Sequence, residues 1–448
     1  MSPVIHWFRQ DLRLSDHPAL RASCASALSR GLPWLPVFVW DPTQAQATRW
    51  VDARMGPHRR LALHQALTHL DRSLRAHGHR LLVLQGEPAQ AIGQIVSDTG
   101  AGEVWTEHLP APEEEAADRA LSSAASRGGW RWERLEQGGL FAWDDLPFDV
   151  QDTPDVFTSF RQAIQRAGLL AREPVAPPPV WPHPMWPRPF DASVCAPGVD
   201  RWPEALSLAN EAVHAEPRAS FPITESEWHI GESIAQAHWS RYLSNGLAQR
   251  YKSTRNGLQG HDFSTKLSPW LAWGAMSARQ AQHALHRWET EHGASESSGW
   301  ITFELLWREH FRLLHAKHGR RLYQPSGLSG LPHPTHDAGA FLRWCAGRTG
   351  HALVDAGMRE LESTGWLSNR MRQIVASYLI HDLAGDWRAG AAWFESRLID
   401  FDVFSNQGNW AYIAGRGTDP RGGRRFDPDK QAREHDPDGR YRRMWRDS

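Results

Sequence analysis

Residues 251–274 read YKSTRNGLQGHDFSTKLSPWLAWG, and this stretch opens the second half of the chain. Ser264, Thr265 and Ser268 surround Lys266 immediately before an apolar helical run. Hydroxyl groups at such a point can cap a helix, and the free backbone N–H groups of a helix start attract a phosphate. A capped helix without any ligand is the alternative. The spacing alone therefore predicts a helix start and leaves the phosphate open.

The sequence around this stretch has a helical pattern. Beyond Trp202, apolar residues recur at three- and four-residue spacing almost throughout, which is the period of an amphipathic helix. We therefore expect an all-α domain over residues 206–448. Its expected helices are Gly231–Leu247, Ala278–Glu291, Trp300–Lys317, Ala338–Ala346, Leu353–Glu362, Ser368–Ala384 and Gly390–Leu398.

One face of the helix expected at Trp300–Lys317 mixes charged and aromatic side chains. This face carries, at positions i, i+3, i+4 and i+7, Glu304, Trp307, Arg308 and Phe311. Burying a carboxylate and a guanidinium costs desolvation energy, so the face suits a pocket that stacks a flat base and bonds its edge. An exposed face with a Glu304–Arg308 ion pair is the alternative.

Two later segments place polar groups in apolar surroundings. In STGWLSNRMRQIVASYL, Ser368 stands at a helix N-cap position, and Asn369 and Arg372 follow one turn apart. In LIDFDVFSNQGNWAYIAG, Asp400 and Asp402 would repel each other unless donors receive them. We expect Arg372 to be the counter-ion of Asp400, a pair that is equally compatible with a purely structural role.

The first third of the chain alternates strands with helices. Such alternation predicts a parallel sheet covered on both faces, a Rossmann-like α/β domain over residues 1–135. No G-x-G-x-x-G follows the first strand, so the sequence indicates no dinucleotide phosphate loop. The expected strands are Val4–Phe8, Leu35–Trp40, Arg80–Gln85, Val104–Glu107 and Trp130–Leu135, and the expected helices are Leu61–Ala76 and Glu113–Ser126.

A proline-rich segment separates the two halves. From Ala171 to Phe190 the chain reads AREPVAPPPVWPHPMWPRPF. Proline at this density forbids helix and central strand and leaves an extended, semi-rigid connector. We expect an interdomain linker over residues 136–205.

The composition excludes several classes of protein. Hydrophobic residues make up 41% and charged residues 23% of the chain, which is typical of a globular protein and not of a disordered one. The formal net charge of -1 means that any nucleic acid must be met by a local basic patch. No apolar stretch approaches about 20 residues and the first residues show no signal-peptide pattern, so we expect no membrane span.

Cysteine and tryptophan usage add two expectations. The three cysteines, Cys24, Cys195 and Cys345, have no paired spacing, which predicts neither a disulfide framework nor a metal site and fits a reducing cytoplasm. There are 24 Trp against 6 Tyr. Most of these indoles are expected in the core, but tryptophan also stacks on flat rings and relays single electrons, so those in polar motifs need not be core residues.

Taken together, the motifs resemble those of the photolyase/cryptochrome family, and most closely its DASH cryptochrome branch. The resemblance is carried by YKSTRNGLQGHDFSTKLSPWLAWGAMSAR, FELLWREHFR, WCAGRTGHALVDAGMRELESTGWLSNRMRQIVAS, DWRAGAAWFES and LIDFDVFSNQGNWAYIAGRGTDPR, and in the first half by HWFRQDLRLSDHPAL and DVFTSFR. It covers the whole chain in the family's order. It implies an all-α domain that binds FAD non-covalently, after an α/β domain.

The resemblance also implies roles around the flavin. The residues that match the loop and helix start holding the FAD phosphates are Tyr251, Ser264, Thr265, Lys266, Leu267 and Ser268. Those that match the surroundings of the flavin and the adenine half are Arg308, Asn369, Arg372, Asp400 and Asp402. Asn406 matches the residue that faces flavin N5, Trp410 the indole nearest the flavin, and Trp387 the next indole outward.

A second set of residues matches the substrate side. Glu304 matches the acidic residue that bonds a damaged base, and Trp307 and Tyr412 match the two aromatic walls of the lesion pocket. We expect Trp410 and Tyr412, in a segment expected to be extended, to point to opposite sides, one toward the flavin and the other toward the substrate. A basic loop would meet the flanking phosphates, with a solvated charge run as the alternative: Arg416, Arg421, Arg424 and Arg425.

The sequence departs from the family pattern in two places. Residues 331–334, Leu-Pro-His-Pro, stand where the outermost tryptophan of the electron chain is expected, and Tyr323 or Trp344 is the candidate replacement. Leu109 or Pro110 falls about where an acidic ligand of a folate antenna, methenyltetrahydrofolate, is expected. The antenna is therefore left open.

The implied function is repair of cyclobutane pyrimidine dimers in UV-damaged DNA, driven by blue light and carried out by a monomer. A histidine pair that the resemblance associates with (6-4) lesions is absent near Ser368 and Asn369, which favours the cyclobutane dimer. Single-stranded DNA is the expected substrate, because it removes most of the cost of unpairing a base. One alternative is a blue-light photoreceptor that binds FAD without repairing DNA. Another is a light-independent flavin oxidoreductase, which would need a nicotinamide site that no glycine motif supports.

Overall fold

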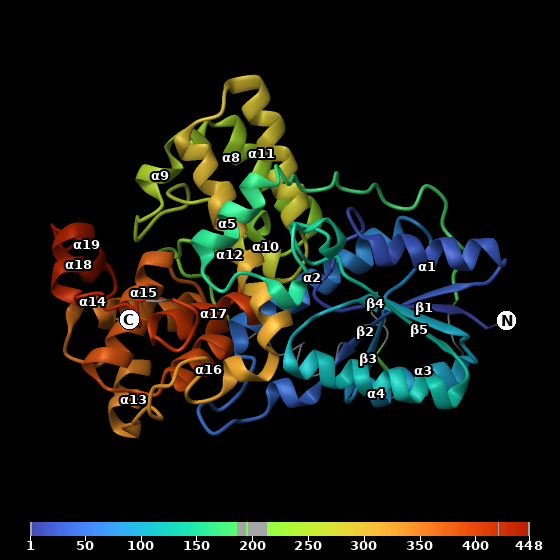
Figure 1. The fold of residues 1–448 in the computed structure, drawn as a ribbon, viewed down its shortest axis with the longest axis horizontal. Helices are drawn as coiled ribbons and strands as arrows, with labels where there is room; N and C mark the ends of the chain where they lie inside the picture. The colour runs from blue at the N-terminus through green and yellow to red at the C-terminus, as the bar shows by residue number, and fades with distance from the viewer. Residues whose placement is uncertain (1, 186–193, 196–212, 420, 447–448) are drawn as a thin grey trace.

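An α/β layer and a helical body follow each other along the chain. The computed structural model describes residues 2–185, 194–195, 213–419 and 421–446. Figure 1 shows the sheet with its covering helices near the N-terminus and the helical body around the C-terminus. The predicted class, a parallel α/β domain followed by an all-α domain, is confirmed.

A six-stranded sheet forms the centre of the α/β layer, in the order β5-β4-β1-β2-β3-β6. The first five strands are parallel, and Val4 of β1 lies opposite both Trp34 and Glu103. A short β6, which the sequence did not predict, adds antiparallel to the edge of β3. The predicted strands are otherwise confirmed with small shifts at their ends: β1 Val4–Phe8, β2 Trp34–Trp40, β3 Leu82–Gln85, β4 Glu103–Glu107, β5 Arg131–Leu135 and β6 Val194–Cys195.

Helices cover both faces of the sheet, because successive side chains of a strand point to opposite sides. Val4 and Phe8 pack with α1 and α2, whereas Ile5 and Trp7 pack with α3 and α4. All four helices begin with proline, whose missing N–H is not needed in the first turn. Two of them, α1 and α3, were not predicted; the bounds are α1 Pro18–Ser29, α2 Pro57–Arg75, α3 Pro88–Thr99 and α4 Pro112–Gly128.

The connector between the two parts is only partly extended. Residues 171–185 contain no helix, as predicted, and residues 186–190 of the proline-rich stretch lie outside the described part. Upstream of them, two 3-10 turns (Trp143–Asp145 and Val150–Asp152) and α5 (Phe157–Arg166) fold within the expected linker. The α5 helix packs on α12, so this region helps to build the helical body.

The helical body follows the predicted pattern with several differences. The helix expected at Ser368–Ala384 is divided into α15 and a π-helical turn, Tyr378–Asp382. The helices α9, α17, α18 and α19 were not predicted. Any helix between residues 202 and 212 lies outside the described part. The bounds are α8 Glu232–Ser244, α9 Tyr251–Thr254, α10 Ser268–Ala272, α11 Ala278–His292, α12 Glu296–His318, α13 Ala338–Cys345, α14 Ala352–Thr364, α15 Asn369–Ser377, α16 Trp387–Arg397, α17 Val403–Ile413, α18 Pro428–His435 and α19 Arg440–Met444.

Two hydrophobic clusters stabilise the helical body. One is continuous with the core of the α/β layer and includes Trp270 of α10 and Leu305 of α12. The other is formed by side chains of α13, α14, α15, α16, α17 and α19. It includes Trp344, Met371 and Trp410. The site described below lies where the two clusters meet.

Two expectations from composition can be compared with the described residues. None of their helices has the length and apolar character that a bilayer span requires. Cys24 and Cys345 are buried and free, and the side chain of Cys195 lies outside the described part.

Candidate functional site

A cavity of about 390 Å³, which we call the helical cavity, lies between the two clusters. Its walls come from α9, α10, α12, α15 and α17, together with the loops before them. The structure brings nearly all of the predicted cofactor and substrate residues into this one cavity: Tyr251, Ser264, Thr265, Lys266, Leu267, Ser268, Glu304, Trp307, Arg308, Asn369, Arg372, Asp400, Asp402 and Tyr412.

The loop before α10 presents its polar side chains to the helical cavity. The α10 helix has only five residues and no side-chain cap, so the predicted capping by its serine and threonine hydroxyls is wrong. These hydroxyls line the cavity instead and can donate to a ligand. The loop is fixed from behind, because His238 Nε2 lies 2.9 Å from the carbonyl oxygen of Thr265.

Lys266 occupies a strained and buried position at this loop. Its φ of 56° lies in the left-handed region, which is unfavourable for a residue other than glycine and is often found at functional sites. Its ammonium lies 3.5 Å from the ring centroid of Phe263 and 3.8 Å from that of Trp366, with no hydrogen-bond acceptor among the described residues. Burial lowers the pKa of Lys266 well below its usual value, against the opposing effect of Glu360. A buried donor without an acceptor beside a cavity fits an anionic or ring-nitrogen ligand.

Arginine side chains form ion pairs with the two aspartates of the LIDFDVF segment, as the sequence predicted for Asp400. Arg372 Nη2 lies 2.8 Å and 3.0 Å from the two carboxylate oxygens of Asp400, whose side chain is fully buried. Asp402 caps α17 by accepting from the N–H of Ser405 at 2.7 Å. Arg308 Nη2 lies 3.8 Å from Asp402 Oδ2, so a second guanidinium balances the second carboxylate.

Glu304 is held by two donors that the sequence did not identify. Its Oε1 accepts from Arg255 Nη1 at 2.5 Å and from Trp300 Nε1 at 3.1 Å. The alternative Glu304–Arg308 ion pair is therefore not formed. Burial raises the pKa of Glu304, and the Arg255 guanidinium opposes that rise. The carboxyl group thus has a fixed orientation toward the cavity and an increased tendency to carry a proton.

Two aromatic rings stand beside Glu304, as the resemblance implied. The ring centroids of Trp307 and Tyr412 are 5.9 Å apart, and the rings meet at 73°. The other face of Trp307 is covered by Phe157 of α5, with centroids 3.7 Å apart and nearly parallel planes. The connector region therefore supports one wall of the predicted lesion pocket.

The backbone that carries Trp410 and Tyr412 is helical, so the prediction of an extended segment is wrong. Both residues belong to α17. Two residues on an α-helix are about 200° apart, so the two side chains still point to different sides. Trp410 is buried in the second cluster, whereas Tyr412 lines the helical cavity.

Gly390 offers a test of how tightly Trp410 is held. A Cβ atom at Gly390 would overlap the Trp410 ring, so Gly390→Ala is expected to cost about 1–3 kcal/mol of unfolding free energy through overpacking. Gly299 in α12 is the matched control, because a Cβ there meets nothing within 4 Å. Gly299→Ala should be neutral or stabilising, since alanine is the better helix former. Urea unfolding of both variants checks the prediction, and equal stability of the two would contradict the packing described for Trp410.

The basic loop after α17 differs from the prediction. Arg416 is only 9% exposed and donates through Nη1 to the Leu331 carbonyl at 2.9 Å, so it does not face an external phosphate. Arg421 and Arg424 both pair with Asp419, at 3.3 Å and 2.9 Å, although the side chain of Arg421 remains 69% exposed. Arg425 pairs with Asp382 in the same way. Within the described residues, Arg421 and Arg425 are the exposed members of this set.

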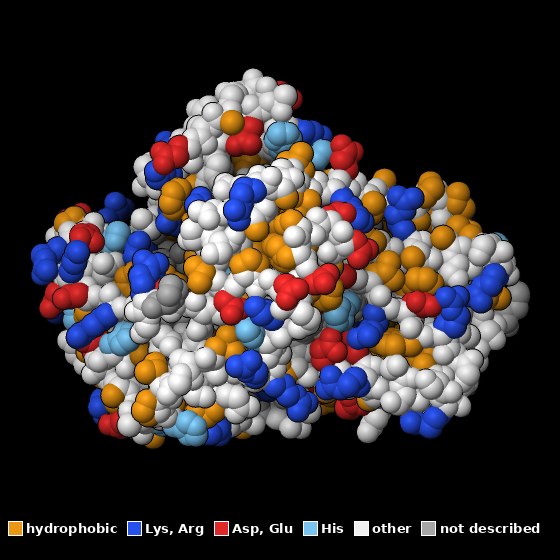
Figure 2. Space-filling model, viewed as in Figure 1, with side chains coloured by type: hydrophobic (Ala, Val, Ile, Leu, Met, Phe, Trp, Pro, Cys, Tyr) orange, Lys and Arg blue, Asp and Glu red, His pale blue; other side chains and the backbone are white. Residues whose placement is uncertain are grey.

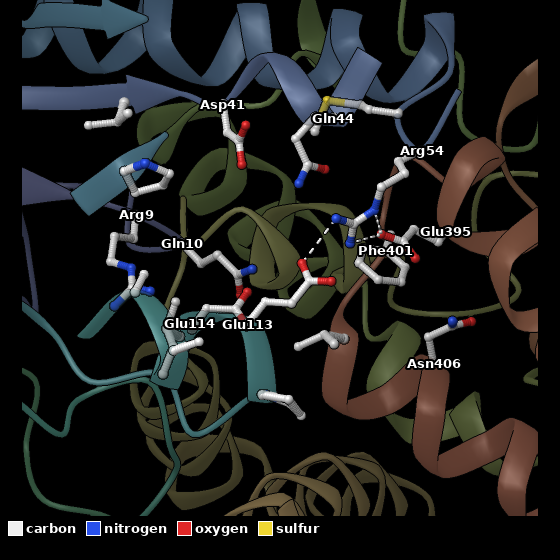
Figure 3. Close-up of a pocket in the computed structure, with 18 of the residues that line it drawn as sticks. Arg9, Gln10, Asp41, Gln44, Arg54, Glu113, Glu114, Glu395, Phe401 and Asn406 are labelled. Carbon is white, nitrogen blue, oxygen red and sulfur yellow. Dashed lines mark hydrogen bonds and ion pairs between the residues drawn. The ribbon is translucent and has the colours of Figure 1, made fainter. Parts of the chain in front are cut away.

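A second cavity of about 900 Å³, the interlayer cavity, lies between the sheet and α16–α17 (Figure 3). Arg54 crosses it and pairs with Glu113 of α4 at 3.0 Å and Glu395 of α16 at 2.9 Å. Asn406 lines this cavity and not the helical one, because its side-chain amide donates to the Ala391 carbonyl at 3.1 Å and is thereby turned toward α16. Its predicted place opposite flavin N5 stays a prediction.

The positions considered for a folate ligand fall on two different cavities. Leu109 is buried and lines the interlayer cavity, whereas Pro110 lines a smaller one of about 380 Å³. The carboxylate nearest to Pro110 along that smaller wall is Glu115, which pairs with His108 at 2.6 Å. A folate antenna stays a prediction.

One histidine–aspartate group was missed by the sequence analysis. His6, Asp11 and His17 are buried with their ligand-type atoms within 4.8 Å of one another. The Leu20 N–H donates to His17 Nδ1 at 3.1 Å, so the proton of this ring is on Nε2, 3.0 Å from Asp11. The Asp11 carboxylate thus lies beside the His17 ring, and the Ser23 hydroxyl lies 3.3 Å from His6 Nδ1.

Comparison with protein families places both parts of the chain. Residues 4–182 match the family model described as DNA photolyase, and residues 300–447 match the model described as the FAD binding domain of DNA photolyase. The first covers strands β1 to β5 and most of the connector, and the second begins within α12 and extends through α19.

Full-length relatives agree with these matches. The chain is 38% identical to a cryptochrome DASH of Gloeobacter violaceus, covering 99% of this chain and 85% of the relative. It is 36% identical to the chloroplastic/mitochondrial cryptochrome DASH of Arabidopsis thaliana, over 99% and 75% of the two chains. Among solved structures, a Synechocystis cryptochrome superposes with a TM-score of 0.89 at 38% identity, over 99% and 89%. A bacterial class III photolyase from Agrobacterium tumefaciens superposes at 0.78 and 29% identity, over 99% and 86%.

The helical cavity fits the cofactor that these comparisons imply. Its orphaned Lys266 ammonium and the free hydroxyls before α10 are suited to a diphosphate, and Asn369 and Arg372 offer donors to a ring edge. The cofactor of this chain is FAD. The chain belongs to the photolyase/cryptochrome family and, within it, to the DASH cryptochrome branch.

Proposed function

We propose that this protein repairs cyclobutane pyrimidine dimers in DNA with the energy of blue light, and that it prefers single-stranded DNA. The observation that carries the proposal is that one cavity unites the FAD-binding donors with Glu304, Trp307 and Tyr412. When bound and reduced, FAD supplies the photoexcited electron that opens the dimer and is returned afterwards. The side chains of this protein bind and orient the two reactants.

The walls of the cavity give each side chain a task. Trp307 and Tyr412 offer ring faces and edges to a base turned out of the strand. Glu304, oriented by Arg255 and Trp300, is placed to hydrogen-bond the polar edge of the damaged base. A crosslinked pyrimidine pair stacks poorly in DNA, so turning it out costs less than for intact bases, and a single strand removes the pairing cost.

Replacement of Glu304 tests the substrate side of the cavity. Glu304→Ala is expected to lower dimer repair by roughly 10- to 100-fold, the equivalent of about 1.5–3 kcal/mol for a hydrogen bond to a charged group. Repair is followed as loss of dimer from an illuminated oligonucleotide, with bound FAD measured in the same sample. Glu296→Ala on the same helix is the control, because Glu296 is 77% exposed and pairs only with Lys252. Unchanged repair by Glu304→Ala would refute the assignment of the pocket.

One observation favours the alternative, a blue-light photoreceptor without repair activity. The arginines expected to meet DNA phosphates are paired with Asp419 and Asp382, which reduces the charge available to a nucleic acid. On the face seen in Figure 2, Lys and Arg side chains alternate with acidic and apolar ones and form no single large patch. Illumination of the reduced protein with single- and double-stranded dimer-containing oligonucleotides separates the two functions, because the photoreceptor leaves both substrates intact.

A further inference from the structure

A line of aromatic rings leads from Trp410 away from the helical cavity. The ring centroid of Trp410 lies 6.3 Å from that of Trp344 on α13, at an interplanar angle of 77°. Phe394 of α16 contacts both indoles, with centroids 5.1 Å from Trp410 and 6.4 Å from Trp344. Trp344 is completely buried and its Nε1 donates to the Val375 carbonyl at 3.0 Å. These two indoles are thus in direct contact within the second cluster.

The line continues to the surface through the α/β part of the chain. Phe341 of α13 lies 6.0 Å from Trp344 on one side and 6.4 Å from Trp50 on the other. Trp50 belongs to the loop between β2 and α2, which runs beneath α16 beside α13 (Figure 1). It is half-buried, and His336 covers one side of its ring with centroids 4.7 Å apart. A single phenyl ring therefore separates a buried indole from one that water reaches.

The other candidate routes are less continuous. Trp387 is 1% exposed, donates to the Pro325 carbonyl, and makes no ring–ring contact with another aromatic of the described residues. Tyr323 contacts only the His315 ring in that part of the chain, and its hydroxyl has no hydrogen-bond partner there. A tyrosine that loses an electron must also lose its proton, so an unpartnered buried hydroxyl is a poor relay. Residues 331–334 supply no indole.

We propose that Trp50 is the surface end of an electron relay that runs through Trp344 to Trp410 and from there to the bound FAD. The proposal rests on the proposed function, since that function needs reduced FAD. In one turnover a single electron passes from Trp50 to the oxidised cofactor by way of the two buried indoles. Trp50, oxidised by one electron, releases its Nε1 proton to water, and an external thiol then returns one hydrogen atom to it. Electrons and protons balance, and the thiol is the net reductant.

The charge beside Trp50 supports its place at the end of the relay. The Arg49 guanidinium lies 3.9 Å from the Trp50 ring centroid. A positive charge there disfavours an indole radical cation and so promotes proton loss to water, which traps the electron hole at the surface. Trp344, in contrast, keeps its proton in the bond to Val375, so the hole can move on.

Photoreduction of the FAD-loaded protein in the presence of dithiothreitol tests the relay. Trp50→Phe and Trp344→Phe are each expected to slow bleaching of the oxidised flavin by about tenfold or more, which corresponds to about 1.4 kcal/mol of added barrier. Trp393→Phe is the matched control, since Trp393 on α16 stacks only with Arg397 and should leave the rate unchanged. A second readout is electron paramagnetic resonance of illuminated, frozen protein, where the tryptophan radical signal should disappear in Trp50→Phe. Arg49→Gln should decrease the population of trapped Trp50 radical that this signal reports, because the radical cation then keeps its proton longer and recombines with the reduced flavin.

The outcomes separate the relay from the proposed function. Chemically reduced Trp50→Phe should repair dimers as the parent protein does, because repair does not draw on the relay. Photoreduction and radical signal that are unchanged in Trp50→Phe would overturn the relay and leave repair untouched. Loss of photoreduction and of the radical signal in Trp387→Phe but not in Trp344→Phe would also overturn the proposed relay, in favour of a route through Trp387. Failure of the reduced parent protein to repair any dimer would instead count against the proposed function.

Discussion

An Asp400→Ala variant is expected to purify without FAD and to lose about 3–5 kcal/mol of unfolding free energy, the usual cost of removing one partner of a buried ion pair. Arg372 makes two bonds to the Asp400 carboxylate, which has no exposed surface. Its remaining bond runs from Nε to the Leu367 carbonyl. Without Asp400, a largely buried guanidinium would stand uncompensated at the wall of the helical cavity. The flavin absorbance of the purified protein and its urea midpoint measure the two effects.

Two controls give this prediction its sharpness. Asp382→Ala breaks the pair with Arg425, whose side chain is 66% exposed, and should cost at most about 1 kcal/mol with full retention of FAD. Asp400→Asn keeps an acceptor for Arg372 and should lie between the two. Normal flavin content together with normal stability in Asp400→Ala would mean that the pair neither holds the cofactor nor supports the fold.

The strands β1, β2 and β3 could be predicted closely because each is a short, mostly buried run of aliphatic or aromatic residues. The helices α1 and α3 escaped for a related reason. The sequence PALRASCASALS of α1 is made mostly of small residues with little contrast between its faces, and α3 contains Gly93 and ends at Gly100. Their positions are set by the sheet on which they pack. Local pattern alone carries little of that information.

The α17 helix shows tertiary packing overriding local preference. Its sequence VFSNQGNWAYI contains Gly408 and two asparagines, which favour turns and extended backbone. In the fold, Gly408 is needed because a Cβ there would overlap the Phe311 ring of α12. Asp402 caps the first turn. The close approach of α17 to α12, which forms the cavity, is thus what makes the segment helical.

The sequence predicted which residues line the helical cavity better than it predicted the hydrogen-bond partners of each side chain. All six residues assigned to the phosphates line the helical cavity, and five of them form one contiguous run, residues 264–268, so their motif is local. The partners of Glu304 were missed, since Arg255 lies in the separate short helix α9. The orientation of the Asn406 side chain likewise depends on a carbonyl of α16, which its local motif does not indicate. The contact of Trp50 with α13 joins the two parts of the chain and leaves no local pattern at all.

Four buried histidines make the stability of this protein sensitive to acid. Burial lowers the pKa of each imidazole to about 4, and each ring donates one N–H to a backbone carbonyl and has no ion pair with a carboxylate among the described residues: His58, His238, His310 and His315. In the unfolded chain the same rings take up protons near their ordinary pKa of about 6.5. Between these two values the unfolded state binds more protons than the folded one. The stability that these four neutral rings contribute is therefore fully present above about pH 6.5 and is lost as the pH falls toward about 4.

The share of the unfolding free energy that these four rings supply is accordingly expected to fall between about pH 7 and about pH 5, by up to about 2–3 kcal/mol for each ring over the full window. His310→Gln should remove the contribution of one ring to this pH dependence. The glutamine amide can replace the Nε2–H that lies 2.8 Å from the Pro154 carbonyl, but it cannot take up a proton in this pH range. His286→Gln is the control, since the His286 ring is 68% exposed and its replacement leaves the buried set intact. Urea unfolding at the two pH values measures the slopes. The unfolding free energy of His310→Gln could instead depend on pH as steeply as that of the parent and of His286→Gln. The His310 ring would then be protonated to the same extent in the folded and unfolded states, which would contradict the prediction that its burial keeps it neutral.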